Sequence, residues 1–337
     1  MESKHNTDLT SAEIAMLWNT YMADTMAYCI LHHFLKTTDD KEIDPVIKYA
    51  SDIAKEHIEV IRDLFIKEKL PLPNGFGKND VNSEAPKLFS DVTYLRYIHH
   101  VGRSGLNAYS LAKGVLARRD IRDLYSKWLQ QSNELFDRVS EIMLEKGVFI
   151  RSPYMAYPER VEYVTDVDFM GGVFGEKRPL LALEVAHLGT NIEVSNVAKT
   201  LLMGFCQVAR SRKVSDYFKR GYDASKKHNE KFIACLKAND SSYPSTWDST
   251  ITSSTESPFS DKLMMFQISA LNSIGMGDYG MALASSMRKD IALLYERLLV
   301  GLGRYADEGA KLMIRQGWFE KPPQTLDRER LRKQAKK

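Results

Sequence analysis

Apolar side chains recur every three or four residues along most of the chain, which is the spacing of α-helices that pack one face on a core. The first stripe comprises Ile14, Leu17, Tyr21, Tyr28, Leu31 and Leu35, and three more stripes follow within the first half. Ser90 or Asp91 and Asp120 fit helix N-caps, and Gly147 fits the position just past a helix end. The pattern predicts four helices of about 26 residues, each about 39 Å long.

The second half of the chain repeats the first. Residues 89–153 align with residues 259–323 at a constant shift of 170, and 18 of the 65 positions are identical. Chance would match about one position in sixteen. Upstream the shift becomes 171, so that Glu13 corresponds to Glu184 and His57 to His228. The chain is therefore predicted to be a tandem duplication.

The connections between the helices predict the topology of each repeat. A short polar turn at residues 37–44 joins the first two helices, and a tighter one at residues 117–119 joins the last two, so both pairs must be antiparallel. The segment between the pairs, residues 70–89, can span about 66 Å when extended, enough to run back along the bundle. One long crossover between two hairpins is the ferritin-like connectivity.

We therefore predict an all-α protein of two tandem ferritin-like four-helix bundles. The first bundle covers residues 1–153, an inter-domain linker covers 154–179, the second bundle covers 180–323, and a basic tail covers 324–337. The linker carries Tyr154, Tyr157, Phe169 and Phe174, and we expect these aromatic side chains to pack on the bundles.

Three motifs give this architecture a family resemblance. PLPNGF precedes the first crossover, PKLFSD begins the third helix and RRDIRDLY begins the fourth. With the tandem pattern, they make the chain resemble an uncharacterised family of paired ferritin-like bundles from spore-forming Bacilli, which is distantly similar to the spore coat protein F group. The resemblance covers nearly the whole chain and implies the fold and a sporulation or stress setting. It implies no catalytic residues, because its motifs cap helices and shape a loop.

Charge and composition narrow the partners and the compartment. The 337 residues include 47 Lys and Arg against 44 Asp and Glu, and residues 321–337 hold seven of the bases and only two of the acids. The positive charge is thus local, and the composition indicates no nucleic-acid partner. Three scattered cysteines favour a reducing compartment over a disulfide framework. With neither a secretory signal nor a membrane span visible, we expect a cytoplasmic protein, or a spore-associated one.

Ferritin-like bundles often hold two metal ions, which requires a Glu from each of two helices and a Glu-x-x-His from each of the others. The first repeat has no Glu-x-x-His, and the second has one, Glu184 to His187, near a helix start and not in mid-bundle. The inward mid-level residues of the fourth helices lack carboxylates: they are Ser132, Leu135, Leu302 and Tyr305. We therefore expect no di-iron centre and no other cofactor.

A smaller polar layer is predicted in the middle of each bundle. Asp24 and His57 lie equally far from the turn that joins their helices, so we expect them to be level and able to touch. Gly102 and Gly105 reach the same depth and leave room for a small pocket, with Tyr109 at its far wall. The second bundle offers Ser195, His228, Gly275 and Tyr279.

This layer has three interpretations. His57 and His228 can be core histidines satisfied by Asp24 and Ser195, which would fix helix register. Alternatively, Asp24, His57 and His99 form a mononuclear site for iron or another divalent ion in the first bundle. Thirdly, a small ligand could bind beside the glycines.

No phosphate-binding loop, nucleophile elbow or paired Cys-x-x-Cys is present. We therefore expect a structural or protective role instead of catalysis. One alternative is metal or small-ligand binding in a mid-bundle pocket of the first repeat. Another is a module for a protein partner or for self-association, which would present an exposed aromatic patch between Tyr154 and Phe174.

Overall fold

The structure is a computed structural model that describes residues 7–173, 177–244 and 250–334. Phe174 and the last three residues of the basic tail lie outside the described residues. The first repeat contains α1 (Ser11–Thr37), α2 (Asp44–Lys67), α3 (Asp91–Lys113) and α4 (Arg119–Glu145). The second contains α5 (Ala182–Val208), α6 (Arg212–Lys237), α7 (Asp261–Ser285) and α8 (Lys289–Arg315), and the short α9 (Arg328–Gln334) follows. The all-α, duplicated architecture predicted from the sequence is confirmed.

Equivalent residues cap equivalent helices in the two repeats. Ser90 and Ser260 accept hydrogen bonds through their side chains from backbone N–H groups in the first turns of α3 and α7. Gly147 and Gly317 follow the last helix of each repeat with φ values of 67° and 71°, a left-handed conformation that suits glycine. Asp120 is not an N-cap: it lies in the first turn of α4, where its carboxylate accepts hydrogen bonds from Arg118.

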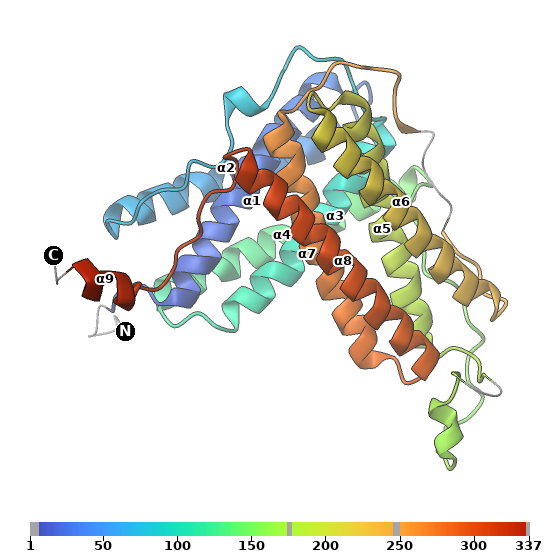
Figure 1. Cartoon of the computed structure of the whole chain (residues 1–337). Helices are drawn as coiled ribbons and strands as arrows, with labels where there is room; N and C mark the ends of the chain where they lie inside the picture. The colour runs from blue at the N-terminus through green and yellow to red at the C-terminus, as the bar shows by residue number, and fades with distance from the viewer. Residues whose placement is uncertain (1–6, 174–176, 245–249, 335–337) are drawn as a thin grey trace.

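Each repeat consists of two helix hairpins joined by a long crossover, as the connection lengths predict. The hairpins are α1–α2 with α3–α4, and α5–α6 with α7–α8. They pack through α2 on α4 and α1 on α3 in the first repeat, and through α6 on α8 and α5 on α7 in the second. Figure 1 shows the two repeats diverging from a common apex, where both crossovers lie.

The two crossovers pair with each other around a local twofold axis. Isolated antiparallel bridges join Val81 to Phe259 and Phe89 to Ile251. These bridges exchange under the shift of 170, because 81 corresponds to 251 and 89 to 259. Their backbone hydrogen bonds obey the same symmetry: the N–H of Ser90 donates to Thr250 O at 2.8 Å, and that of Ser260 donates to Asp80 O at 2.9 Å. The repeats are therefore joined like the subunits of a symmetric dimer.

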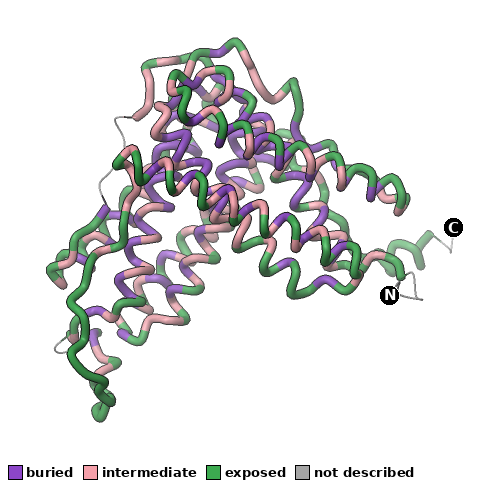
Figure 2. The backbone as a smooth tube through the Cα atoms, turned by 180° about the vertical axis from the view of Figure 1, so that it is seen from behind, coloured by how far each residue is buried: buried purple, intermediate pink, exposed green. Residues whose placement is uncertain are grey.

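One hydrophobic core extends across the boundary between the repeats. It includes Phe34, Phe89 and Ile98 of the first repeat together with Phe205 and Phe259 of the second, all at most 2% exposed. Helix α3 contacts α5, and α1 contacts α7, which are again symmetry-related pairs. Buried residues accordingly concentrate near the apex, and the free ends of the hairpins expose more of their surface (Figure 2).

The linker between the repeats does not pack on the bundles as expected. Tyr154, Tyr157 and Tyr163 are 86%, 95% and 91% exposed. Phe169, in the short helical turn η2 (Val167–Met170), is the exception, since the Arg178 guanidinium lies 4.4 Å from the centre of its ring. The expectation that the linker aromatics pack on the bundles was therefore wrong for these three tyrosines.

Candidate functional site

Asp24 and His57 meet in the middle of the first repeat, as their positions on α1 and α2 predict. His57 Nδ1 lies 3.0 Å from Asp24 Oδ2. The His57 side chain is fully buried, and that of Asp24 is 13% exposed. Tyr109 Oη, from α3, lies 3.3 Å from the same ring nitrogen. Three helices therefore contribute to one polar layer inside an apolar bundle.

On the opposite side of the ring, His57 begins a hydrogen-bond network that includes three further residues. His57 Nε2 lies 3.0 Å from Gln131 Oε1 on α4, and Gln131 Nε2 donates to Glu56 Oε2 at 2.9 Å. Lys127 Nζ donates to the other Glu56 oxygen. Because a carboxylate only accepts, Glu56 fixes the amide so that Gln131 Oε1 faces the histidine.

These partners determine the protonation of His57. The Gln131 oxygen accepts from Nε2–H, and the Asp24 carboxylate accepts from Nδ1–H when the ring is protonated. Burial alone would lower the pKa of His57, but the Asp24 charge and the two hydrogen bonds outweigh it and raise that pKa. Burial raises the pKa of Asp24, while His57 opposes that shift. The layer therefore favours the protonated ring, and Asp24 and Gln131 occupy both of its nitrogens.

The pocket predicted beside Gly102 and Gly105 is not formed, and the expectation was wrong for a packing reason. A Cβ added to Gly105 would lie 2.3 Å from Ser132 Oγ, and one added to Gly102 would lie 3.2 Å from the Phe136 backbone. The glycines thus let α3 approach α4 closely instead of opening space. The Trp128 ring also packs against that of His57, with the two centroids 4.5 Å apart.

The second repeat keeps the histidine but not its charged partners. His228 Nδ1 lies 3.0 Å from Tyr279 Oη, and Ser195, the counterpart of Asp24, donates to Ser225 O at 3.2 Å. The counterparts of Gln131 and Glu56 are Gly301 and Lys227. Burial lowers the pKa of His228 to about 4, so its ring is neutral at pH 7. At the same fold position the pKa of the histidine is therefore raised in the first repeat and lowered in the second.

A small cavity of about 40 Å³ lies at this level in the second repeat, bordered by Asn191, Ser195, His228, Gly275 and Tyr279. Asn191 Oδ1 is buried and has no hydrogen-bond partner among the described residues. Ligand sites usually measure about 300–1,000 Å³, so the cavity suits a buried water molecule and little more. The cavity occurs in this repeat because Leu298 and Gly301 stand where the first repeat has the larger Trp128 and Gln131.

His99 lies apart from Asp24 and His57. Its ring lies 4.5 Å from that of Phe136 and meets the Phe149 ring edge-on at 5.6 Å, centroid to centroid. It borders a polar cluster between the repeats, in which Arg103 Nη2 on α3 donates to both carboxylate oxygens of Asp278 on α7 at 3.0 Å. Burial and the Arg103 charge lower the pKa of His99 to about 4. The structure thus does not assemble the set Asp24, His57 and His99.

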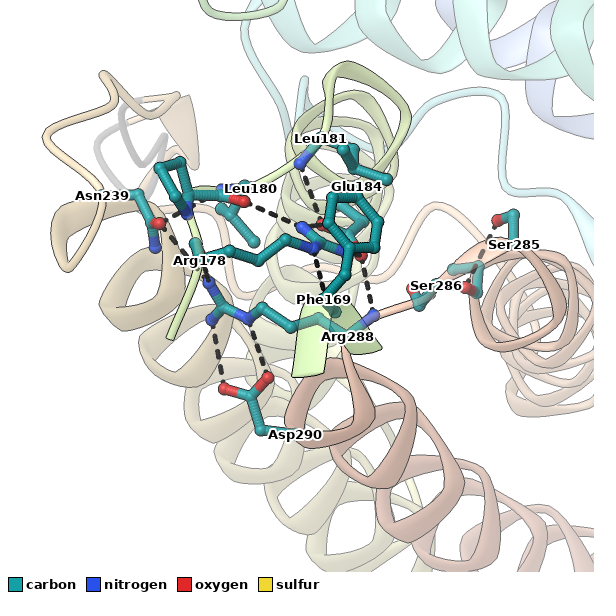
Figure 3. Close-up of polar contacts among 12 residues, drawn as sticks. Phe169, Arg178, Leu180, Leu181, Glu184, Asn239, Ser285, Ser286, Arg288 and Asp290 are labelled. Atoms are coloured by element: carbon teal, nitrogen blue, oxygen red, sulfur yellow. Dashed lines mark hydrogen bonds and ion pairs between the residues drawn. The ribbon is translucent and has the colours of Figure 1, made fainter. Parts of the chain in front are cut away.

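Glu184 of the Glu-x-x-His sequence serves to join chain segments (Figure 3). Its carboxylate accepts two hydrogen bonds at 2.9 Å from Arg178 of the linker, and others from the N–H groups of Leu181 and Arg288. Although burial raises the pKa of Glu184, these donors more than compensate and lower it. Glu13 has the same role in the first repeat, accepting from Ala117 N and Arg118 N. These carboxylates hold the bundle ends and are not free to bind a metal ion.

The described residues offer neither a cluster of metal ligands nor a helix that could span a membrane. No group of three or more His, Cys, Asp or Glu side chains is arranged to hold a metal ion. No helix in the described part of the chain has the length and apolar character needed to cross a membrane. The cysteines are free thiols, and burial raises the pKa of Cys29 to about 12.

A family model described as a protein of unknown function (DUF3231) matches residues 1–161 and again residues 168–331. The chain belongs to the DUF3231 family. The double match confirms the tandem duplication and the family resemblance inferred from the sequence.

A second comparison concerns a crystal structure of a "putative spore coat protein" from Bacillus halodurans C-125. It shares 18% sequence identity with this DUF3231 protein and has a TM-score of 0.41. The similarity covers 44% of this chain and 98% of the other, which corresponds to the length of one repeat. No functionally curated protein matches the chain.

The sequence pattern predicts three residues of the polar layer, namely Asp24, His57 and Tyr109. It does not predict the other three, Gln131, Glu56 and Lys127. The inward position on α4 was assigned to Ser132, which is buried, whereas Gln131 lies at the edge of the buried stripe. The signal that could have found the network is the i, i+4 pair of Lys127 and Gln131 on α4, which faces Glu56 on α2.

Proposed function

We propose that this DUF3231 protein is a non-catalytic helical scaffold. The observation that carries the proposal is the closed polar layer of the first repeat, in which the side chains of Asp24 and Gln131 occupy both nitrogens of His57. A metal ion needs a free nitrogen lone pair, and a general base needs an accessible one. Neither is offered at this position.

The shared core supports the same conclusion. Paired crossovers and a core common to both repeats make one body from two bundles. The buried Asp24–His57 pair fixes the register of α1 and α2 more than it adds stability, because hydrophobic residues of similar size often stabilise a core equally well. These features suit a body that must keep its shape. A setting in sporulation or stress protection remains the expectation that the family resemblance gives.

The test replaces the polar layer with apolar side chains. A triple variant, Asp24→Leu, His57→Leu and Gln131→Leu, removes the histidine and the two side chains that occupy its nitrogens while preserving bulk. If the protein is a scaffold, the variant keeps its helix content and restores the phenotype of a strain that lacks the gene. A variant that folds with wild-type helix content but fails to restore the phenotype would contradict the proposal.

A second function is favoured by a specific observation. Tyr154, Tyr157 and Tyr163 are grouped on one segment of the linker and are highly exposed, and grouped exposed apolar side chains are typical of surfaces that bind a partner. We propose that the linker binds a protein. Replacing Tyr154, Tyr157 and Tyr163 with Ser should abolish that binding and leave helix content unchanged, and loss of helix content would contradict a purely surface role.

A further inference from the structure

The linker presents an extended apolar surface on the outside of the molecule. We define the linker face as the exposed side chains of residues 154–168: Tyr154, Met155, Tyr157, Val161, Tyr163, Val164 and Val167. Tyr157, Val161 and Tyr163 are each at least 90% exposed. Residues 154–166 of this face have neither a helix nor a strand assigned, and residues 159 and 160 form a bend.

The linker face is also acidic. Glu159, Glu162, Asp166 and Asp168 lie among its apolar side chains, and all four residues are exposed. Arg160 is the single base within the same range, and it pairs with Glu162 at 2.7 Å. A partner for this surface should therefore combine apolar side chains with excess positive charge.

The C-terminal tail has this complementary character. Around α9, Leu326 and Leu331 are 69% and 46% exposed. Four bases lie beside them: Arg328, Arg330, Arg332 and Lys333. Arg332 pairs with Glu329 at 2.8 Å, and every described residue from 325 onward is exposed. We call residues 325–334 the basic tail helix segment.

The two surfaces lie at opposite ends of the molecule. In Figure 1 α9 is beside the N-terminus at one side, whereas the linker with η2 projects at the other. Figure 2, from behind, shows the same separation. The rigid repeats between them prevent a contact within one chain, so any contact between these surfaces joins two chains.

We propose that the linker face of one copy binds the basic tail helix segment of another, in a head-to-tail contact. Because the two surfaces differ, each bound pair of copies still leaves one linker face and one tail segment free. Repetition gives a linear assembly of this chain. The proposal rests on the linker as a binding surface and names its partner as a second copy.

Salt should weaken the contact, because its charges are exposed and screened beyond about 10 Å at 0.1 M ionic strength. The contact is expected to be reversible and dependent on concentration. Sedimentation velocity of nuclease-treated wild-type protein at low salt should show a mass that rises with concentration. The mass should return to that of one chain at 1 M salt.

Two half-disabled chains test the head-to-tail arrangement directly. A chain that ends at Gln324 keeps the linker face and lacks the tail segment. A full-length chain with Glu159→Gln, Glu162→Gln and Asp168→Asn keeps the tail segment and has a neutralised linker face. Each should sediment as a monomer alone, and an equimolar mixture should form a one-to-one dimer and nothing larger.

The matched control removes the same charge elsewhere. Asp63, Glu230 and Glu296 are exposed on α2, α6 and α8, and Asp63→Asn, Glu230→Gln and Glu296→Gln should leave the assembly unchanged.

Self-association of the chain that ends at Gln324 would indicate a linker–linker contact and overturn the proposal. A wild type that stays monomeric, or associates only with nucleic acid, would overturn it too. None of these outcomes bears on the metal content or fold of the bundles, so the scaffold proposal is tested separately.

Discussion

Tyr97 and Gln267 occupy the same position in the two repeats and hydrogen-bond to each other, with Tyr97 Oη donating to Gln267 Oε1 at 2.9 Å. Both residues are buried, at 2% and 4% exposure. A position that meets its own counterpart marks a twofold axis, here inside one chain. The two equivalent positions hold different residues, and one supplies the hydrogen-bond donor while the other supplies the acceptor.

Removing the Tyr97 hydroxyl should weaken the joint between the repeats. Tyr97→Phe leaves the buried Gln267 oxygen without its donor, so the free energy of unfolding should fall by about 1–3 kcal/mol. Urea unfolding followed by circular dichroism measures the change. The double variant Tyr97→Phe with Gln267→Leu should recover part of the loss, and equal loss in both variants would argue against the hydrogen bond as its cause.

The Asp24–His57 pair should be costly to break from one side. Asp24→Asn removes the charge that holds the His57 imidazolium, and the expected loss of stability is about 3–5 kcal/mol in urea unfolding at pH 6. The matched control is Ser195→Ala in the second repeat, which removes a neutral hydrogen bond and should cost about 1 kcal/mol. Similar losses in both variants would contradict a charged layer in the first repeat.

The pair also predicts a pH dependence. Because the pKa of His57 is raised in the folded state, its contribution is fully present below its unfolded pKa of about 6.5. That contribution disappears as the pH rises through the folded pKa of His57. Asp24→Asn should abolish this part of the stability profile.

Two equivalent glycines should respond in opposite ways to alanine. Gly105→Ala places a Cβ 2.3 Å from Ser132 Oγ, so α3 and α4 must separate, at a cost of about 1–3 kcal/mol. Gly275→Ala places its Cβ 3.5 Å from Leu302 Cδ2, an ordinary contact. There the gain in helix propensity should stabilise by about 1 kcal/mol. Equal responses in thermal unfolding would contradict the difference in packing between the repeats.

The fold was predictable because its signals are local and repeated. Stripes of apolar residues give the helices, connection lengths give the hairpins and the crossover, and the shift of 170 gives the duplication. The joint between the repeats was not predictable, because pairing of Val81 with Phe259 depends on contacts between distant segments. The crossover segments have no periodic pattern of apolar residues that would predict such pairing.

The candidate site was predictable only in part, for a related reason. Equal distances from a turn place Asp24 opposite His57, which the structure bears out at 3.0 Å. The space around them depends on how closely α3 approaches α4. Glycine permits either a pocket or a close approach, and only the facing residue decides between them. In the first repeat that residue is Ser132, and its contact with Gly105 closes the space.

Buried histidines should make the protein sensitive to acid. Burial lowers the pKa of His99 and of His228 to about 4, and that of His100 to about 3. Below about pH 6.5 the unfolded chain binds protons that the folded chain does not, which costs about 1.4 kcal/mol per pH unit for each histidine. Glu193 acts in the opposite sense, because burial raises its pKa to about 7. Burial also lowers the pKa of His33 and of His187 and raises that of Asp24, so five histidines against two carboxylates predict a net loss of stability on acidification.

The variant His99→Phe isolates one of these contributions. Phenylalanine keeps the aromatic contacts with Phe136 and Phe149 and removes the titrating group. Urea unfolding at pH 7 and pH 5 should show a drop in stability about 2 kcal/mol smaller than in the wild type. An unchanged drop would show that His99 already binds its proton in the folded protein at pH 5.

The most direct test of the scaffold account is the metal content of full-length protein purified without chelators from cells supplied with iron, manganese and zinc. Elemental analysis should find far less than one ion per chain, because the hydrogen bonds to Asp24 and Gln131 occupy both ring nitrogens of His57. One ion per chain in the wild type, lost in His57→Gln and retained in His228→Gln, would contradict the account.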